Sequence, residues 1–519
     1  METLTVCHKS LAPARAMAAI HLKDLPAPYW DAELTLTCLQ GLVNRNVPRL
    51  FLVQDVYDEK WLDWLVERGD VDDLVWLSLD EALERFLPAV EGLVLVAPAI
   101  PASYNVATML AGIKNCLVAT PAFAQSYGLL AKLPAGARNN LLDLGGFRWG
   151  KDVEAYRWFY DRYFDQLSHR MCAMMDPWDL PLRDYMVEFR LPLFWVSFSY
   201  DRAEAALAEE LLLRLPPNIP CLGWPYAPRS QDPGVGEDMG VILVNECAKF
   251  EVCSGYETVS RAVSNLSVHS GTKATLQHKS LPPPPLEQKV YVSFIRTDGD
   301  GPNFYRECYR SLWDDACHGR FPMGWQQGPT LYDLIPDILD WFYTHATPND
   351  SFVNALTGIG YIHEENYAYL YPPEQRQEIW RDYLRLSQAY RERSGFSCLT
   401  TYHEMSPDKL ESFCQLGFKG VFANYGRSFI TSLHNQTEEV AGVPVFRACL
   451  KSEARTVDGV VADIRKWTPR GRPEFIFVSL NNWLTRLEYA EAVIAQLGPE
   501  YVAVTPEQLV GLYWQSKTA

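Results

Sequence analysis

Short apolar runs alternate with helical patterns along most of the chain. In the N-terminal part, the runs that we interpret as strands are Arg49–Val53, Leu74–Leu77, Gly92–Ala97 and Cys116–Ala119. Strands that alternate with short helices indicate a parallel sheet covered on both faces. We therefore predict a Rossmann-like α/β domain for residues 1–150. No GxGxxG sequence follows the first strand, so this prediction includes no dinucleotide site.

The same alternation continues in residues 151–285, which we predict to form a second α/β unit. Its strands are expected at Leu193–Phe198 and Pro220–Trp224, after a long aromatic helix at Val153–Leu167. The unit ends in a polar stretch, Ser267–Lys289, that contains four consecutive prolines. Such a composition is typical of an extended linker, so a new domain is expected to begin there.

Residues 286–519 repeat the pattern of strand and helix. The predicted strands are Val290–Thr297, Phe352–Leu356, Ser397–Tyr402, Gly420–Asn424, Val443–Cys449, Glu474–Leu480 and Tyr501–Val504. Most pairs of strands are separated by a helical segment. Repeated β/α units of this kind predict a seven-stranded TIM-like (β/α) barrel, with one strand of the usual eight missing or degenerate.

Polar residues gather just after five of these predicted strands. They are Asp298 and Asp300, then Tyr361, His363 and Glu364, then His403 and Glu404, then Asn424, and finally Asn481, Asn482 and Trp483. In such barrels the loops at the carboxyl ends of the strands build the active site, so we predict that these groups line one cavity. Taken singly, each has a structural alternative. An Asp-Gly-Asp sequence can form a capped turn, and a histidine at a strand end can be purely structural.

The charge of the chain disfavours several classes of partner. It has 64 acidic and 47 basic residues among 519, a formal charge of -17 that repels nucleic acid and anionic membranes. A neutral ligand is easier to accommodate, and 16 Trp and 27 Tyr offer faces that can stack on sugar rings. We therefore expect a carbohydrate partner, no nucleic-acid partner and no membrane partner. The oligomeric state stays open.

Cysteine usage and hydropathy bear on the location of the protein. The 12 cysteines are scattered without a CxxC pair, which is typical of reduced thiols and not of a zinc site or a disulfide framework. No apolar stretch reaches the roughly 18 residues of a membrane span, and the N-terminus lacks a signal-peptide pattern. We therefore expect a cytoplasmic protein, or a secreted one if a leader has been removed.

Several sequence runs together resemble one known family. The runs are VSFIRTDGDG at residues 292–301, the segment Pro322–Tyr361, and FVSLNNW at Phe477–Trp483. They are similar to the family of putative glycoside hydrolases named for a Gly-x-Gly-Tyr-x-Tyr-Pro motif. Leu34–Val53 resembles the N-terminal companion domain of that family. The resemblance extends over nearly the whole chain and implies a sugar-processing protein.

The motif that names the family is only half present. Gly358, Gly360 and Tyr361 match it, whereas a His and a Glu stand where the family has its second Tyr and its Pro. A Tyr-x-Tyr-Pro sequence follows at residues 369–372, which indicates an inserted loop. This departure predicts a retained pocket floor with a different specificity.

The leading hypothesis, which the resemblance supports, is glycoside hydrolysis by one protonated and one ionised carboxyl group. Asp298 and Asp300 are the candidates for the ionised group, and Glu364 or Glu404 is the candidate acid. The guanidinium of Arg296 would help to keep one aspartate ionised. The residues expected to bind the sugar are Arg296, Trp325, Tyr361, His363, His403, Asn424, Asn481, Asn482 and Trp483.

Two alternatives stay open from the sequence. An acidic pair in an incomplete barrel also suits the divalent ion of a carbohydrate deacetylase, but no His-x3-His pair or comparable set completes such a site. The other alternative is a carbohydrate-binding protein without turnover, which would keep the aromatic residues. We expect an enzyme that uses no metal ion and no other cofactor.

Overall fold

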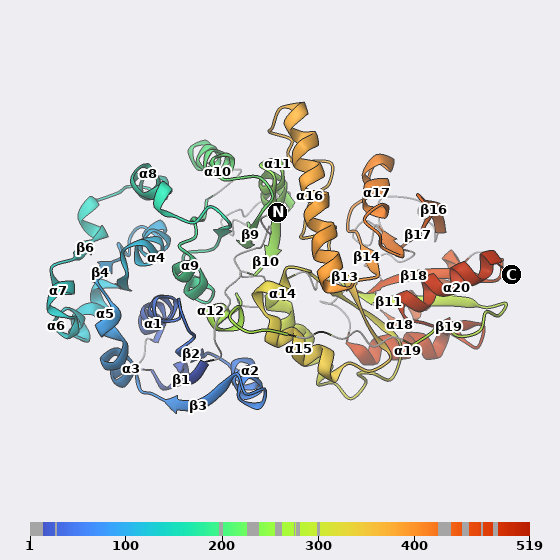
Figure 1. Ribbon diagram of the computed structural model, residues 1–519, viewed down its shortest axis with the longest axis horizontal. Coiled ribbons are helices and arrows are strands. Elements are labelled where there is room, and N and C mark those ends of the chain that lie inside the picture. Colours follow the sequence, from blue (N-terminus) through green and yellow to red (C-terminus); the bar gives the residue numbers. More distant parts are fainter. Residues whose placement is uncertain are drawn as a thin grey trace. The chain divides into compact units, whose positions relative to one another are not determined.

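The chain folds into two compact units (Figure 1). The first comprises Met1–Ala274 and the segment Asp333–Ile338, and the second comprises Thr275–Tyr332 and Leu339–Ala519. This computed structural model describes residues 14–25, 29–196, 201–225, 238–254, 262–274, 276, 281–297, 301–423, 437–448, 456–468, 471–480 and 486–518.

The described strands of the first unit form three separate parallel sheets. They are β1 (Ala14–His21), β2 (Leu50–Val53), β3 (Val71–Trp76), β4 (Gly92–Leu95), β5 (Cys116–Ala119), β6 (Leu141–Asp143), β7 (Cys172–Met174), β8 (Leu193–Phe194), β9 (Ile219–Gly223) and β10 (Lys249–Cys253). Their orders are β2-β1-β3, β5-β4-β6 and β10-β9-β7-β8. The predicted parallel α/β structure is thus present. A Rossmann-like fold, which needs one continuous doubly wound sheet, is not shown.

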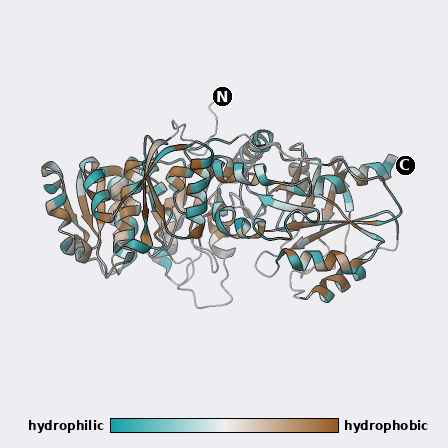
Figure 2. Ribbon diagram, turned by 90° about the horizontal axis from the view of Figure 1, so that it is seen from below, coloured by the Kyte–Doolittle hydropathy of each residue, from teal (hydrophilic) through white to brown (hydrophobic). Residues whose placement is uncertain are grey.

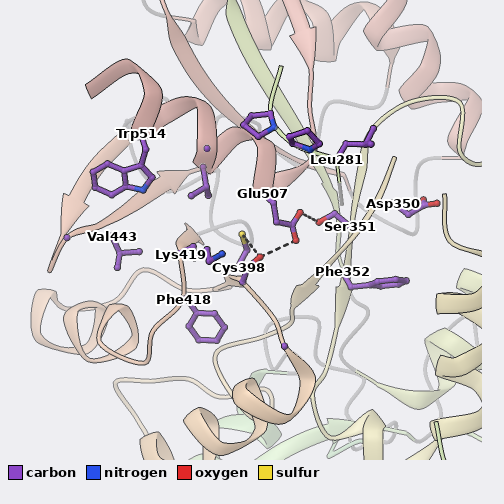
Figure 3. Close-up of a pocket in the computed structure, with 17 residues that line it drawn as sticks. Leu281, Asp350, Ser351, Phe352, Cys398, Phe418, Lys419, Val443, Glu507 and Trp514 are labelled. Atoms are coloured by element: carbon purple, nitrogen blue, oxygen red, sulfur yellow. Dashed lines mark hydrogen bonds between the residues drawn. The ribbon is translucent and has the colours of Figure 1, made fainter. Parts of the chain in front are cut away.

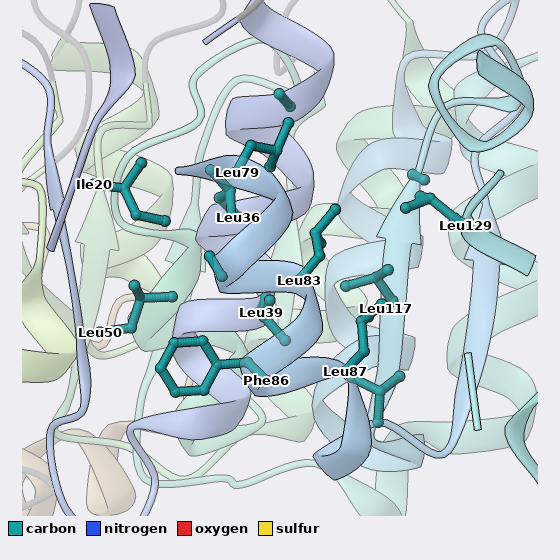
Figure 4. Close-up of a cluster of buried hydrophobic side chains, with 14 of the residues drawn as sticks. Ile20, Leu36, Leu39, Leu50, Leu79, Leu83, Phe86, Leu87, Leu117 and Leu129 are labelled. Atoms are coloured by element: carbon teal, nitrogen blue, oxygen red, sulfur yellow. The ribbon is translucent and has the colours of Figure 1, made fainter. Parts of the chain in front are cut away.

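One hydrophobic core holds the first two of these sheets and their helices together (Figure 4). The described helices of the unit are α1 (Tyr29–Val43), α2 (Val56–Glu67), α3 (Leu79–Phe86), α4 (Ala102–Lys114), α5 (Pro121–Ser126), α6 (Leu129–Lys132), α7 (Ala135–Arg138), α8 (Asp152–Tyr163), α9 (Arg183–Phe189), α10 (Arg202–Arg214), α11 (Asp238–Glu246) and α12 (Leu266–His269). Leu36 and Leu39 of α1 and Leu83 of α3 are fully buried in the same cluster as Leu50 of β2 and Leu117 of β5. Positions three or four apart share one side of a helix, so these leucines form continuous apolar faces.

The segment Asp333–Ile338 belongs to the first unit through buried polar contacts of Asp337. Its carboxylate lies 2.7 Å from His269 Nδ1 and accepts a hydrogen bond of 3.1 Å from Thr272 Oγ1. Its backbone carbonyl accepts a bond of 2.9 Å from Trp64 Nε1. Buried polar groups need such partners, so these bonds fix where the segment packs.

The second unit is built on a nine-stranded sheet. Its strands, drawn with their hydropathy in Figure 2, are β11 (Val290–Arg296), β12 (Met323–Gln327), β13 (Asp350–Asn354), β14 (Cys398–Thr400), β15 (Gly420–Ala423), β16 (Thr437–Val440), β17 (Val443–Arg447), β18 (Glu474–Leu480) and β19 (Tyr501–Ala503). The order is β16-β17-β15-β14-β13-β12-β11-β18, and β19 pairs with β11. All pairs are parallel except β16 with β17, so the sheet is mixed.

Strand β11 brings the two ends of this sheet together. Along Val290–Arg296 one edge of β11 pairs with β18. The other edge pairs with β19 at Val290–Val292 and with β12 at Ile295–Arg296. A bridge between Ala448, just after β17, and Phe477 of β18 joins the sheet on the far side of β18. The result is a nearly closed, barrel-like sheet.

The prediction of seven strands is wrong because two strands lack the usual sequence pattern. β12 reads MGWQQ, with a glycine and two glutamines where β-branched residues are expected, although all five residues are buried. β16 reads TEEV and, among the described strands, pairs with β17 alone, at the edge of the sheet, where charged side chains are common. The seven predicted strands are all present, with ends shifted by a few residues.

The described helices that follow and connect these strands vary in length, and the longest has 22 residues. They are α13 (Tyr309–Trp313), preceded by a π-helical turn at Phe304–Cys308, α14 (Leu331–Leu334), α15 (Pro336–His345), α16 (Pro373–Ser394), α17 (Pro407–Cys414), α18 (Val457–Trp467), α19 (Leu487–Leu497) and α20 (Pro506–Thr518). Helices α14 and α15 contain the segment that belongs to the first unit.

Helix α20 crosses the amino-terminal end of the barrel. Glu507, in the first turn of α20, accepts a hydrogen bond from the hydroxyl of Ser351 of β13. Val510 packs so closely on Gly420 of β15 that a Cβ added to Gly420 would lie 2.4 Å from Val510 Cγ2. Tyr513 contacts Phe475 of β18 edge to face. These three strands lie at different places around the curled sheet. A single helix can contact all of them only if it crosses one end of the barrel. The carboxyl end of the barrel is therefore the one left to the loops.

Asp350, at the start of β13, is the centre of a buried polar network. Its carboxylate accepts bonds of 2.8 Å from Trp325 Nε1, from Thr347 N and from Thr347 Oγ1, and lies 3.0 Å from His318 Nε2. Burial raises the pKa of Asp350, but the bonds from His318 and Thr347 outweigh this effect and hold the pKa below its ordinary value.

We expect Asp350→Asn to lower the free energy of unfolding by about 2–4 kcal/mol at neutral pH. The folded-state pKa of Asp350 lies below the unfolded-state value of about 3.9, so its contribution is present above that value and is lost as the pH falls through the folded-state pKa. Urea unfolding of both proteins across the acid range should show the difference between them shrinking. A constant difference would contradict this account. The control is Asp382→Asn on α16, where the aspartate side chain is 40% exposed.

Candidate active site at the carboxyl ends of β13 and β14

The chain leaves β13 through a tight turn with a constrained backbone. Leu356, Thr357 and Gly358 have φ values of 44°, 67° and 94°, so three successive residues lie in the left-handed region. This conformation is unfavourable for Leu and more so for the β-branched Thr. The Asn354 side chain holds the turn by donating bonds to the carbonyls of Ala355 (3.1 Å) and Gly358 (2.7 Å). Backbone strain of this kind concentrates at functional sites.

Helix α16 supports the same turn from outside. Tyr383 Oη donates a bond of 2.6 Å to the carbonyl of Thr357, and Ser387 Oγ accepts a bond of 3.2 Å from the amide of Ile359. A Cβ at Gly358 would lie 2.5 Å from Ser387 Oγ, so the position requires glycine for space as well as for its φ. Gly358, the first glycine of the sequence motif, thus shapes the backbone that precedes Tyr361.

Four predicted site residues come together beyond this turn. The ring centres of His363 and His403 are 3.9 Å apart. The ring of Tyr361 is nearly parallel to that of His403, with 6.0 Å between the ring centres. Glu364 Oε2 lies 3.6 Å from His403 Nδ1. Tyr361, His363 and Glu364 come from the loop after β13 and His403 from the loop after β14, so the two strand ends converge as expected. All four side chains are buried.

The carboxyl group of Glu364 is buried without a hydrogen bond from any residue that the structure describes. Its exposed fraction is 1%, and both oxygens lack a donor. The separation from His403 exceeds hydrogen-bond range. Buried carboxyl groups normally have such partners, and exceptions of this kind occur at catalytic sites. Glu364 is therefore free to donate a proton to a ligand, or to accept one.

We name the group formed by Tyr361, His363, Glu364 and His403 the Glu364 cluster. Helices α16 and α17 add an aromatic ring and a positive charge near it. Lys409 Nζ of α17 stands 3.3 Å from the ring centre of Trp380 on α16. Burial lowers the pKa of Lys409 to about 8, and the carboxylates of Glu365 and Glu364 oppose that shift. Neither helical residue was predicted from the sequence.

The loops after β13 and β14 are also tied to each other. Glu365 is exposed, and its Oε1 accepts a bond of 2.8 Å from the backbone amide of Ser406. This contact links the two loops that form the Glu364 cluster. The neighbouring Glu404 is exposed, and no bond of its carboxylate is seen among the described residues. The structure thus separates the two candidate acids: one is buried in the cluster and the other faces water.

Two other predicted residues occupy core positions. Trp325 is 1% exposed, its ring packs against Tyr309 and Trp313 of α13, and its Nε1 donates to Asp350. Its ring therefore has no face open for a sugar, contrary to the expectation from the sequence. Arg296 is fully buried at the end of β11. The remaining predicted residues lie outside the described residues; they are Asp298, Asp300, Asn424, Asn481, Asn482 and Trp483.

The part of the chain that the structure describes contains neither a candidate metal site nor a membrane-spanning helix. No group of three or more His, Cys, Asp or Glu side chains is placed to hold a metal ion there. None of the described helices is long and apolar enough to cross a membrane.

Three family models match the chain. They are the GxGYxYP putative glycoside hydrolase C-terminal domain at residues 288–514, the GxGYxYP_N second domain at residues 90–167 and the GxGYxYP third domain at residues 169–271. The chain belongs to the GxGYxYP family. The C-terminal match includes the whole Glu364 cluster, so the cluster lies in the domain for which the family is named.

A solved structure shares the fold. It is a putative hydrolase from Bacteroides thetaiotaomicron VPI-5482, 19% identical, with a TM-score of 0.80 over 98% of this chain and 96% of its own. A UDP-GlcNAc 2-epimerase from Methanocaldococcus jannaschii is 8% identical over 82% of this chain and 99% of its own. Its TM-score of 0.14 is too low to indicate a shared fold. None of the curated proteins compared matches the chain. At these identities the likeness concerns the fold alone.

We expect Gly358→Ala to destabilise the second unit by about 2–4 kcal/mol, because it combines a positive φ with a clash against Ser387. Gly442→Ala is the matched control, since Gly442 has a φ of 77° but nothing within 4 Å of the added Cβ. Thermal and urea unfolding of both variants measure the difference. Equal losses for the two would show that Ser387 does not constrain the turn.

Proposed function

We propose that the protein is a glycoside hydrolase in which Glu364 is the general acid. The observation that carries the proposal is a buried carboxyl group that receives no hydrogen bond from the described residues and lies beside His403, at the carboxyl ends of two adjacent barrel strands. In barrels of this type catalysis takes place at that end. Membership of the GxGYxYP family and the likeness in fold to a putative hydrolase support the same reaction class.

The reaction needs two carboxyl groups with different tasks. Glu364 would protonate the glycosidic oxygen as the bond to the sugar breaks, and a second, ionised carboxylate would attack the sugar or activate water. We propose Asp298 or Asp300 for this second group, because both follow β11, whose carboxyl end lies at the same mouth. A separation of about 5–5.5 Å would give retention and one of about 6.5–9.5 Å inversion.

The substrate we propose is a neutral carbohydrate. Tyr361, His363 and His403 carry groups that can bond sugar hydroxyls. Their rings pack together, and His403 Nδ1 lies 3.6 Å from Glu364 Oε2. The formal charge of -17 disfavours polyanionic substrates such as nucleic acid. The other residues proposed to bind the sugar are Asn424, Asn481, Asn482 and Trp483.

We expect Glu364→Gln to lower kcat/KM on unactivated glycosides by about 10²–10⁴-fold, the usual contribution of a general acid. The loss should be much smaller on dinitrophenyl glycosides, because their leaving group departs without a proton. Steady-state rates on both substrate types measure this contrast. Glu404→Gln should lose far less, and Glu374→Gln, exposed in the first turn of α16, is the control.

An equal loss on both substrate types would contradict the role of Glu364 as acid and would favour a base or nucleophile. A large loss in Glu404→Gln with none in Glu364→Gln would transfer the role to Glu404. No turnover of any glycoside by the wild type would favour the non-catalytic binding alternative.

We also expect turnover to survive chelation, because hydrolysis by two carboxyl groups uses no metal ion. Rates before and after dialysis against EDTA measure this directly. Loss of activity that one added divalent ion restores would instead favour a deacetylase-like reaction, in which a metal ion activates water.

A further inference from the structure

The second unit contains a cavity of about 570 Å³ that the proposed reaction does not use (Figure 3). It lies at the amino-terminal ends of β13, β14, β15 and β17, beside α20. The Glu364 cluster follows the carboxyl ends of β13 and β14, so the two places are at opposite ends of the same strands. The volume falls within the range of small-molecule sites, about 300–1,000 Å³.

The cavity exists because small residues stand where several elements meet. Ser351 of β13, Cys398 of β14 and Ser397 just before β14 line it, and Gly442 and Gly511 line it from a turn and from α20. The larger side chains of β13 are directed elsewhere: Asp350 bonds His318 and Trp325, and Phe352 stacks on Tyr343 at 4.2 Å. In Figure 3 the side chains of Asp350 and Phe352 point away from the centre.

One carboxylate forms the polar floor of this cavity. Glu507, in the first turn of α20, accepts hydrogen bonds from the hydroxyls of Ser351 and Ser397, the latter at 3.2 Å. A carboxylate has about four acceptor positions and a hydroxyl two, so the two bonds leave acceptors for a ligand. The bonds also hold the carboxylate in one orientation, which reduces the ordering that binding would require.

The rim supplies an aromatic ring and a donor. Trp514 of α20 is 37% exposed, and its indole lies at the edge of the cavity (Figure 3). Lys419 lines the cavity near β15 and is exposed. The proline-rich segment forms one wall: Gln508 Nε2 donates a bond of 3.1 Å to the carbonyl of Pro282, so this wall is fixed before any ligand arrives.

We propose that this cavity is a second carbohydrate-binding site, for one or two rings of a neutral sugar. Sugar hydroxyls can donate to the Glu507 carboxylate and accept from Lys419, and the apolar face of a ring can lie on Trp514. An anion is disfavoured by Glu507 and a cation by Lys419, while a wholly apolar ligand would strip water from both charges. The inference does not depend on the reaction proposed for Glu364.

The test measures sugar binding in a protein whose catalytic cluster is disabled. Saturation-transfer NMR and calorimetry on Glu364→Gln would use cellobiose, maltose, lactose and N,N′-diacetylchitobiose, one at a time. We expect at least one of them to bind, with affinity lowered about tenfold or more by adding Trp514→Ala or Glu507→Gln. Lys419→Met should also weaken binding, and because the Lys419 side chain is exposed this variant leaves the fold intact.

The matched control is Trp178→Ala, which removes an exposed tryptophan of the first unit and should leave affinity unchanged. Two results would overturn the proposal. One is that none of the four sugars binds to Glu364→Gln. The other is binding that neither Trp514→Ala nor Lys419→Met weakens, which would place the sugar at another site.

Discussion

The candidate site depends on the path that the chain takes as it leaves β13. Three successive residues in the left-handed region turn the backbone, and Asn354, Tyr383 and Ser387 hold it in that conformation. The loop that follows then brings Glu364 into a buried position beside His403. Burial of a carboxyl group without hydrogen bonds is unfavourable by itself, so the surrounding structure must stabilise it. The hydrogen bonds of the turn and the contact between Glu365 and Ser406 contribute to that stability.

The two ends of the barrel-like sheet have different tasks in this account. At the amino-terminal end α20 crosses from β13 to β18 and packs its apolar residues on the sheet. At the carboxyl end no regular element occupies the described loops after β13 and β14, so these loops can carry polar groups. A rigid sheet under such loops suits catalysis, because the strands fix the positions from which the side chains start.

The sequence predicted the parts of the fold that follow a clear apolar pattern. The strands that became β11, β13, β15 and β18 are apolar runs followed by polar residues, and the convergence of Tyr361, His363, Glu364 and His403 follows from parallel strands ending at one edge. β12 was missed because its burial comes from tertiary packing of Trp325 and two glutamines, not from β-branched residues. β1, with the sequence ARAMAAIH, was missed for a similar reason, since alanine has little strand preference.

Side-chain roles were harder to predict than strands. Trp325 was expected to bind the sugar, but strand alternation directs its ring to α13 and the core. Glu364 is buried and Glu404 is exposed. The sequence shows only that each acidic residue follows a strand, so it could not predict which of the two would be buried. Lys409 and Trp380 lie on helices with ordinary spacing, so only the folded structure brings them near Glu364.

The central claim is that Glu364 meets the glycosidic oxygen of a bound sugar. A crystal structure of the protein with a non-hydrolysable thio-linked oligosaccharide tests it most directly. The account predicts that the sulfur replacing the glycosidic oxygen lies near hydrogen-bond distance, about 2.6–3.2 Å for the natural atom, from the Glu364 carboxyl group, with Tyr361 and His403 beside the ring. A sugar bound with its linkage beyond the reach of Glu364, or one found only at the Glu507 cavity, would contradict it.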